Sequence, residues 1–432
     1  MQRDIYIKQK NHKSKMVANI SNGFCLGTIL VIACLLLVRD ACGISINKYI
    51  FLLILTPALL IFNEKYLLIL WMFLMPLFVG LPGNYITIIV LLRFLIQVIH
   101  GGKLKIYKYP FIFTVLLAMF IFMQNIAHKY IGAYYMIFIA ELFVVYFFIT
   151  MDCKSYFPEI MLSYSFGIAM TGIIMLVATL QTYSFSDLLS AATRLGLAGQ
   201  TTEMTVIIDP NYYGLFAITA LSCNWQMITR KKYSKSQKNI ALIFSGISMV
   251  VALIGMSRAF ILCFAIWILL TLLFEKKLSL KIKVIITGIV CIGIAYYFLP
   301  NTVQAIMKRF TGKDMQTANG RTVVFDRIEI LWGSSIITML FGIGLFDCNV
   351  HFMQMQYFFG LGIVGTMLML LLVFSYWNWM KRKCKRYSLV DLVPIFIIQF
   401  SSSSVPTAQS LTFMMPVVIS LIVFGVTTGS EL

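Results

Sequence analysis

Long apolar runs, separated by short polar segments, recur along the chain from residue 17 almost to its end. A helix needs about 20 mainly apolar residues to cross the roughly 30 Å hydrocarbon core of a membrane. Backbone in that core must satisfy its hydrogen bonds internally, and the runs lack the inward-polar alternation of a membrane barrel. The runs therefore predict transmembrane helices. The predicted spans are 17–38, 48–62, 66–80, 84–99, 109–125, 130–150, 158–180, 208–228, 239–256, 258–274, 282–299, 351–378, 390–408 and 411–428.

The composition is typical of an integral membrane protein. Of the 432 residues, 60% are hydrophobic and 12% are charged, whereas a soluble globular chain carries about 25% charged residues. The first apolar run follows a basic arm, but it is too long for a signal peptide and has no small-residue cleavage site, so we interpret it as a membrane anchor. We expect an all-α, polytopic helical bundle of roughly 12–14 transmembrane helices, even in number, with residues 1–432 as a single transmembrane domain.

The basic residues predict the orientation, because Lys and Arg collect in loops that remain cytoplasmic. When the predicted spans alternate from a cytoplasmic amino terminus, the basic segments 230–238, 276–283 and 381–386 all fall on the cytoplasmic side. This predicts a multi-pass protein of the bacterial cytoplasmic (inner) membrane with both termini in the cytoplasm. The net charge of +19 then reflects the topology and attraction to anionic membrane lipids, so no nucleic-acid partner is expected.

Two long segments fall on the predicted outer side, the first external loop at 181–207 and the second at 300–350. Loops of this length are commonly functional. Basic residues are unusually frequent on this side, and guanidinium groups match phosphate oxygens in a bidentate fork, which suggests an anionic or phosphorylated substrate. Anchoring of single side chains to lipid headgroups is the alternative. The external basic residues include Arg194, Arg258, Lys308, Arg309, Lys313, Arg321 and Arg327.

His351 ends the second loop at the mouth of a predicted helix. An imidazole there could transfer a proton near neutral pH. Because a lone histidine is more often structural, that alternative stays open. The nine cysteines are scattered singly, and no His/Cys cluster has the spacing of metal ligands, so neither a metal nor another cofactor is predicted.

Several short motifs follow one another between residues 205 and 370. They are Asp209-Pro210-Asn211-Tyr212, Met256-Ser257-Arg258, Gly320-Arg321-Thr322 with Phe325, Phe341-Gly342-Ile343-Gly344, His351, and Gly360-x-Gly362-Ile363-Val364-Gly365. Their order and spacing resemble the shared core of the O-antigen polymerase (Wzy) and O-antigen ligase family of bacterial membrane glycosyltransferases. The ligase branch tends to place Asn, Ser or Gln after the histidine, whereas Phe352 stands here. That departure, together with the Asp-Pro-Asn motif, favours the polymerase.

The resemblance implies a metal-independent transferase that moves an undecaprenyl-pyrophosphate-linked oligosaccharide onto a sugar hydroxyl of another lipid-linked repeat unit. Arg258 and Arg321 would bind the leaving pyrophosphate, and His351 would receive or orient the hydroxyl proton. A chain-length regulator and a flippase are the expected protein partners. The expected substrate-binding residues are Arg194, Arg309, Asp209 and Asn211.

Other functions stay open at this point. A ligase would transfer the glycan to a lipid or protein acceptor. A lipid-linked oligosaccharide flippase would have a similar number of helices, but transporters commonly show related halves and polar sites at the membrane midplane. A structural or assembly partner is the third possibility.

Arg93 and Glu141 are the conspicuous ionisable residues within the predicted spans. Such groups are functional hypotheses by default. Arg93 lies close enough to the cytoplasmic end of its span for its side chain to reach the headgroup region, which gives it a structural alternative. An ion pair between the two residues is a further possibility.

Overall fold

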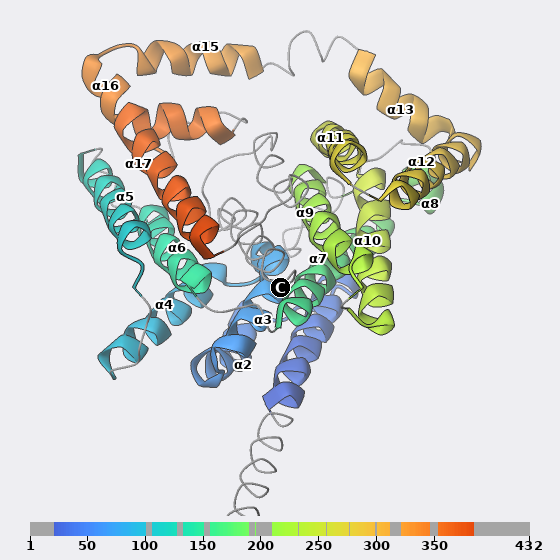
Figure 1. The fold of residues 1–432 in the computed structure, drawn as a ribbon, viewed down its shortest axis with the longest axis horizontal. Coiled ribbons are helices and arrows are strands. Elements are labelled where there is room, and N and C mark those ends of the chain that lie inside the picture. The colour runs from blue at the N-terminus through green and yellow to red at the C-terminus, as the bar shows by residue number, and fades with distance from the viewer. Residues whose placement is uncertain are drawn as a thin grey trace, which may run out of the picture.

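The computed structural model describes residues 21–100, 106–127, 133–150, 156–189, 195, 210–231, 233–255, 257–275, 277–298, 300–311, 321–345 and 353–383. Every regular element in these residues is helical, and none is a strand (Figure 1). After a first helix at Ser21–Ala41, which ends in the π-helical turn η1 (Leu37–Ala41), the elements are α2 (Lys48–Ile61), α3 (Glu64–Leu74), the 3₁₀ turn η2 (Met75–Gly80), α4 (Gly83–Ile99), α5 (Lys108–Ala127), α6 (Ala133–Thr150), α7 (Phe157–Leu180), α8 (Phe185–Leu189), α9 (Pro210–Thr229), α10 (Lys235–Ile254), α11 (Arg258–Phe274), α12 (Leu278–Phe298), α13 (Pro300–Thr311), α15 (Arg321–Trp332), α16 (Ile336–Phe341) and α17 (Met353–Lys383).

The protein is a helical membrane protein. Five of the described helices are long and apolar enough to cross a membrane, and four shorter apolar helices accompany them. Large apolar side chains also point away from the protein, such as Leu53, which is 77% exposed, and Ile61, which is 74% exposed. Lipid is the solvent in which such a surface is stable. The five long helices are Ser21–Ala41, Lys108–Ala127, Phe157–Leu180, Lys235–Ile254 and Met355–Tyr376.

The predicted spans and the observed helices differ in two places. The predicted span 66–80 is α3 followed by the tighter turn η2, because Pro76 has no N–H to continue an α-helical ladder. The predicted long loop 300–350 contains α13, α15 and α16, which are short helices. The predicted spans 390–408 and 411–428 lie outside the described residues.

Helix α7 forms the centre of the bundle and packs against α3, α9 and α10. Gly167 allows the close approach of α3, since a Cβ at this position would overlap the carbonyl oxygen of Phe73. On the other side, the buried Asn224 side chain of α9 donates to Ser165 Oγ of α7 at 2.9 Å and to Ser245 Oγ of α10 at 2.8 Å. These polar contacts hold the three helices together. In a membrane, apolar side chains pack against lipid as well as against one another, so apolar packing alone would not select this arrangement.

A buried ion pair closes the first helix. Arg39 Nε donates to Asp40 Oδ1 at 2.7 Å and Arg39 Nη2 donates to Asp40 Oδ2 at 2.8 Å, with the two side chains only 5% and 2% exposed. The Arg39 guanidinium also lies 4.9 Å from the centroid of the Phe51 ring. Gln181, just after α7, donates its side-chain amide to the carbonyl of Ala41. The π-helical turn η1 thus holds a charged pair against α2 and α7.

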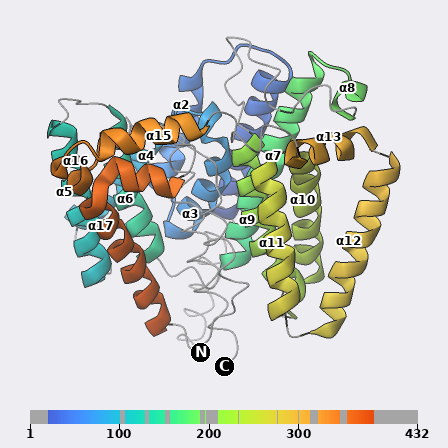
Figure 2. The same ribbon diagram turned by 90° about the horizontal axis from the view of Figure 1, so that it is seen from above.

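Three short helices gather at one end of the bundle. Figure 2 shows α13 across the upper ends of α10, α11 and α12, and α15 and α16 beside the upper ends of α5 and α17. We call this the α13 end. The carboxyl end of α5 lies here as well, since Gln124 contacts Phe341 of α16. Helix α6 then crosses the bundle to the opposite end, and α7 begins there.

Candidate functional site

The structure describes the backbone of four of the seven predicted site residues. Arg258 is the first residue of α11, and Arg321 is the first residue of α15. Asn211 is the second residue of α9, and Arg309 lies in the last turn of α13. His351, Asp209 and Arg194 lie outside the described residues.

Two motifs of the family resemblance meet through their backbones. The N–H of Ile343 donates to the Phe359 carbonyl at 3.0 Å, and the N–H of Gly344 donates to the Gly360 carbonyl at 3.1 Å. We call this contact the glycine junction, with Gly342, Gly344, Gly360 and Gly362 as its members. It joins the end of α16 to the first third of α17.

Glycine is required at this junction for two physical reasons. Gly342, Gly344 and Gly362 have φ values of 82°, 106° and 65°, a region that side-chain-bearing residues rarely adopt. The backbones are also too close for side chains, since a Cβ at Gly342 would lie 2.6 Å from Gly362 N and a Cβ at Gly362 would lie 2.6 Å from the Leu340 carbonyl oxygen. The conformation at Gly362 divides α17 into an initial segment and a longer second segment that change direction there (Figure 1).

Gln124 of α5 binds both sides of the glycine junction through hydrogen bonds. Its Nε2 donates to the Phe341 carbonyl at 2.7 Å and to the Gly360 carbonyl at 2.7 Å, and the side chain is only 6% exposed. One amide group therefore bonds both sides of the contact. Sequence reasoning missed Gln124, although the adjacent amides Gln124 and Asn125 at the end of the apolar run 109–125 were a visible signal that the helix has a polar partner.

Helix α15 is held against the initial segment of α17 by aromatic packing. Trp332 lies 5.0 Å from Phe358 and 5.6 Å from Phe359, measured between ring centroids. Ile328 is buried in the same small cluster. Arg321 begins this helix, so its backbone is positioned relative to the glycine junction. His351 precedes α17 by two residues in the sequence.

The starts of α9 and α11 also lie together. Ser257 is fully buried and caps α11, where the N–H of Phe260 donates to Ser257 Oγ at 3.3 Å. A Cβ at Gly255 would lie 3.2 Å from Pro210 Cβ, which places the turn before α11 against the first residue of α9. Arg258 and Asn211, each one residue beyond these contacts, therefore start neighbouring helices at the same end.

The two groups of motifs share the α13 end. Helix α11 contacts α13 directly, and α15 begins on the side that faces α13 and α11 in both views (Figures 1 and 2). The structure thus brings Arg258 close to Asn211, and it packs the last turn of α15 near the glycine junction, with Arg321 at the opposite end of that helix. It describes no packing between α15 and α11 that joins the two groups into one cavity.

The two ionisable residues of the predicted spans have different surroundings. Glu141 is buried in α6, with 1% of its surface exposed. Arg93 Nη1 donates to the carbonyl of Leu60 at 3.1 Å, at the end of α2. The described residues contain no group of three His, Cys, Asp or Glu side chains that could hold a metal ion.

The chain matches no protein-family model, no curated protein and no solved structure. The resemblance to the O-antigen polymerase and ligase family rests on the motifs described above and stays a prediction.

Proposed function

We propose that the protein is a polymerase of O-antigen, capsule or exopolysaccharide chains. It would transfer an undecaprenyl-pyrophosphate-linked oligosaccharide to the sugar hydroxyl of another lipid-linked repeat unit, on the outer face of the bacterial cytoplasmic membrane. The observation that carries the proposal is the glycine junction. Motifs that resemble one family, more than fifteen residues apart in the sequence, are paired there by backbone hydrogen bonds at the end of the bundle where Arg258 and Arg321 begin their helices.

The reaction takes place on the outer side of the membrane, and neither nucleotide sugars nor ATP are present on that side. The energy comes from the bond between the donor sugar and the lipid pyrophosphate, which is broken during the transfer. The acceptor hydroxyl oxygen forms a bond to the anomeric carbon of the donor while the bond from that carbon to the pyrophosphate oxygen breaks. The hydroxyl proton passes to a base, and lipid pyrophosphate leaves with the electron pair.

The proposed roles follow the charge changes in this step. Negative charge develops on the leaving pyrophosphate, so Arg258 and Arg321 would stabilise it with preorganised N–H donors. His351 would receive or orient the hydroxyl proton. Because α13 is amphipathic and carries Lys308 and Arg309, it would present positive charge to the glycan or pyrophosphate at the same end. Arg194, Asp209 and Asn211 would complete the substrate contacts.

Reconstitution of the purified protein tests the function. Given lipid-linked repeat units of one length, the protein should produce a ladder of longer glycans without ATP. Products on a different lipid or on a protein acceptor would identify a ligase. Movement of the donor across the bilayer without any new glycosidic bond would identify a flippase, and either result would contradict the polymerase.

Single substitutions test the residue roles. His351→Ala should remove most turnover and leave donor binding nearly intact, since a general base contributes about 10²–10⁴-fold to rate. Arg258→Ala and Arg321→Ala should weaken donor binding as well, and Lys should rescue only partly because it cannot form the bidentate fork. Normal glycan length from both arginine variants at normal membrane level would refute the assignment.

A further inference from the structure

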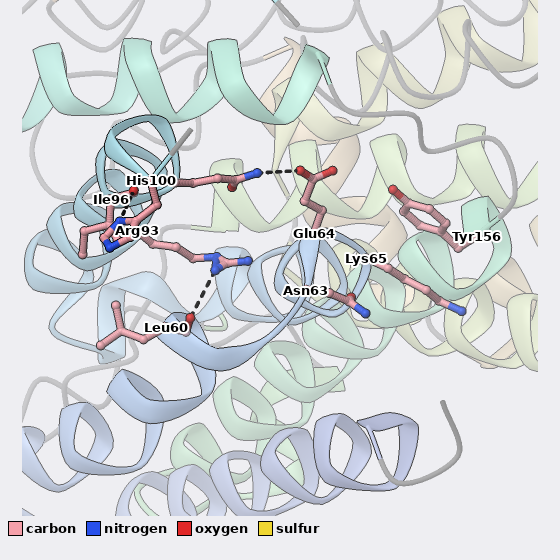
Figure 3. A pocket seen from close by; sticks show the side chains of 9 residues that line it. Leu60, Asn63, Glu64, Lys65, Arg93, Ile96, His100 and Tyr156 are labelled. Atoms are coloured by element: carbon pink, nitrogen blue, oxygen red, sulfur yellow. Dashed lines mark hydrogen bonds between the residues drawn. The ribbon is translucent and has the colours of Figure 1, made fainter. Parts of the chain in front are cut away.

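A cavity of about 770 Å³ opens at the end of the bundle opposite the α13 end. It lies where α2 ends, α3 begins and α4 ends, beside the residue that precedes α7 (Figure 3). Its position differs from that of the proposed glycosyl-transfer site. Its lining includes Leu60, Glu64, Lys65, Arg93, Ile96 and Gln97.

The cavity has two cationic side chains with unused hydrogen-bonding capacity. Arg93 reaches from α4 and is anchored by its bond to the Leu60 carbonyl. Its Nε is buried and has no acceptor among the residues that the structure describes. Lys65 Nζ lies 3.4 Å from Glu159 Oε1, and its side chain is 33% exposed, so it can still offer a donor.

The lining of the cavity also contains hydrogen-bond acceptors, which are the Glu64 carboxylate and the Gln97 side-chain oxygen. Gln97 Nε2 donates to Glu64 Oε1 at 3.1 Å, which turns the amide so that its oxygen faces away from that carboxylate. Gln97 Oε1 is buried and receives no hydrogen bond within the described part of the chain. Figure 3 shows Arg93 extending from α4 toward the start of α3, where Glu64 lies. A ligand that fills this space meets a hydrogen-bond donor and acceptors side by side.

The charges of the lining decide which class of ligand fits. Lys65 is paired with Glu159, and Arg93 lies in the field of Glu64. Because each cation has a carboxylate near it, an anion would gain little net attraction. A zwitterion would satisfy both signs at once, with its negative group on Arg93 and its positive group on Glu64 and Gln97.

The surroundings indicate that the zwitterion belongs to a lipid. Leu60 and Ile96 line the cavity and are 42% and 48% exposed, and Ile99 beside them is 78% exposed. Apolar side chains exposed at helix ends lie at the level where headgroups meet acyl chains. Pockets between helices at this level are known to hold lipid headgroups.

We propose that this cavity binds the phosphoethanolamine headgroup of a membrane lipid. The headgroup phosphate accepts from the N–H groups of the Arg93 guanidinium that face the cavity. The primary ammonium donates to Gln97 Oε1 and the Glu64 carboxylate, and the acyl chains lie along Leu60 and Ile96. Choline has no N–H to donate and glycerol has no positive charge, so the same lining discriminates against phosphatidylcholine and phosphatidylglycerol.

Native mass spectrometry of the full-length protein in detergent tests the proposal with three lipids of identical acyl chains. Phosphatidylethanolamine should bind about tenfold more tightly than either phosphatidylcholine or phosphatidylglycerol, as expected for one additional charge-assisted contact. Gln97→Leu should reduce the preference for ethanolamine over choline and leave choline binding unchanged. Arg93→Gln should weaken both. Lys48→Gln, which removes a cation at the other end of α2, is the matched control and should change neither.

Three results would overturn the proposal. Tighter binding of phosphatidylglycerol would show that the cavity selects an anion. An unchanged preference in a monodisperse Gln97→Leu protein would remove the amide from recognition. Displacement of the lipid by equimolar soluble phosphoethanolamine would show that a free metabolite, and not a lipid, is the ligand. None of these outcomes depends on glycosyl transfer, because the measurement is binding alone.

Discussion

Replacing Gln124 by Leu should loosen the glycine junction and shorten the glycan product. The change removes both hydrogen bonds from Gln124 Nε2, so the Phe341 carbonyl loses this donor in a partly buried contact, while the Gly360 carbonyl keeps its bond from Gly344. A fully buried carbonyl without its donor costs about 1–3 kcal/mol, so the loss at Phe341 lies toward the lower end, and a second bond to a satisfied carbonyl is worth about 1 kcal/mol. The substitution also removes Gln124 Oε1, a buried acceptor with no described donor. That gain offsets part of the loss, and the expected net destabilisation is about 2 kcal/mol.

Two measurements separate stability from function. Thermal unfolding of the purified Gln124→Leu protein should begin a few °C lower, about 2–4 °C per kcal/mol for a large chain. Glycan length in cells, normalised to membrane protein level, should fall because the start of α17 is no longer held. Met123→Leu is the matched control, since Met123 is the preceding residue and is 62% exposed. Unchanged unfolding and unchanged glycan length for Gln124→Leu would refute the role of the junction.

The remaining predictions concern backbone strain, buried charge and topology. Gly362→Ala should lower membrane protein level and glycan length, because the φ of 65° and the contact with Leu340 leave no room for Cβ. Asp40→Ala should destabilise the protein by about 3–5 kcal/mol in thermal or chemical unfolding, since it leaves Arg39 buried without its partner. Reporter fusions after Lys235 should report cytoplasm and those near residue 315 should report the exterior, and the reverse result would remove the outer-face reaction.

Each of these changes has its own comparison. Gly288→Ala places the same methyl group on α12, where nothing lies within 4 Å of the new Cβ, so it should be neutral or slightly stabilising. The double replacement of Arg39 by Met and Asp40 by Leu should cost less than either single change, because no uncompensated charge remains buried. Equal losses in the single and double variants would show that the ion pair itself does not set the stability.

The hydrophobic pattern predicted the helical membrane class because lipid-facing and buried positions in a span are both apolar. The runs 109–125 and 158–180 correspond closely to α5 and α7. The same pattern gave no sign of α13 or α15, since neither of these short helices is more apolar than a loop. At Pro76 it extended a span where the backbone tightens into a 3₁₀ turn, because hydropathy takes no account of a missing N–H.

The glycines of the candidate site were recognised as motifs, but their geometry was not foreseeable. Gln124 is bonded to residues 217 and 236 positions away. A single sequence carries no record of such a pairing, because neither residue differs locally from others of its type. The cavity lined by Arg93 and Gln97 was missed for the same reason, since its walls come from α2, α3 and α4 together.

The pairing of Arg39 with the very next residue bears on how the protein enters the membrane. A charged side chain at the centre of a span adds about 2.5–3.5 kcal/mol to the cost of insertion, and one near the end of a span, such as Arg39, adds less. In an ion pair between distant segments, the first charge is without its partner until the second segment has been synthesised. Here both charges emerge from the ribosome one after the other and the π-helical turn η1 already brings them together. The first helix can therefore leave the translocon as an electrically neutral unit, before α2 or α7 exists to receive it.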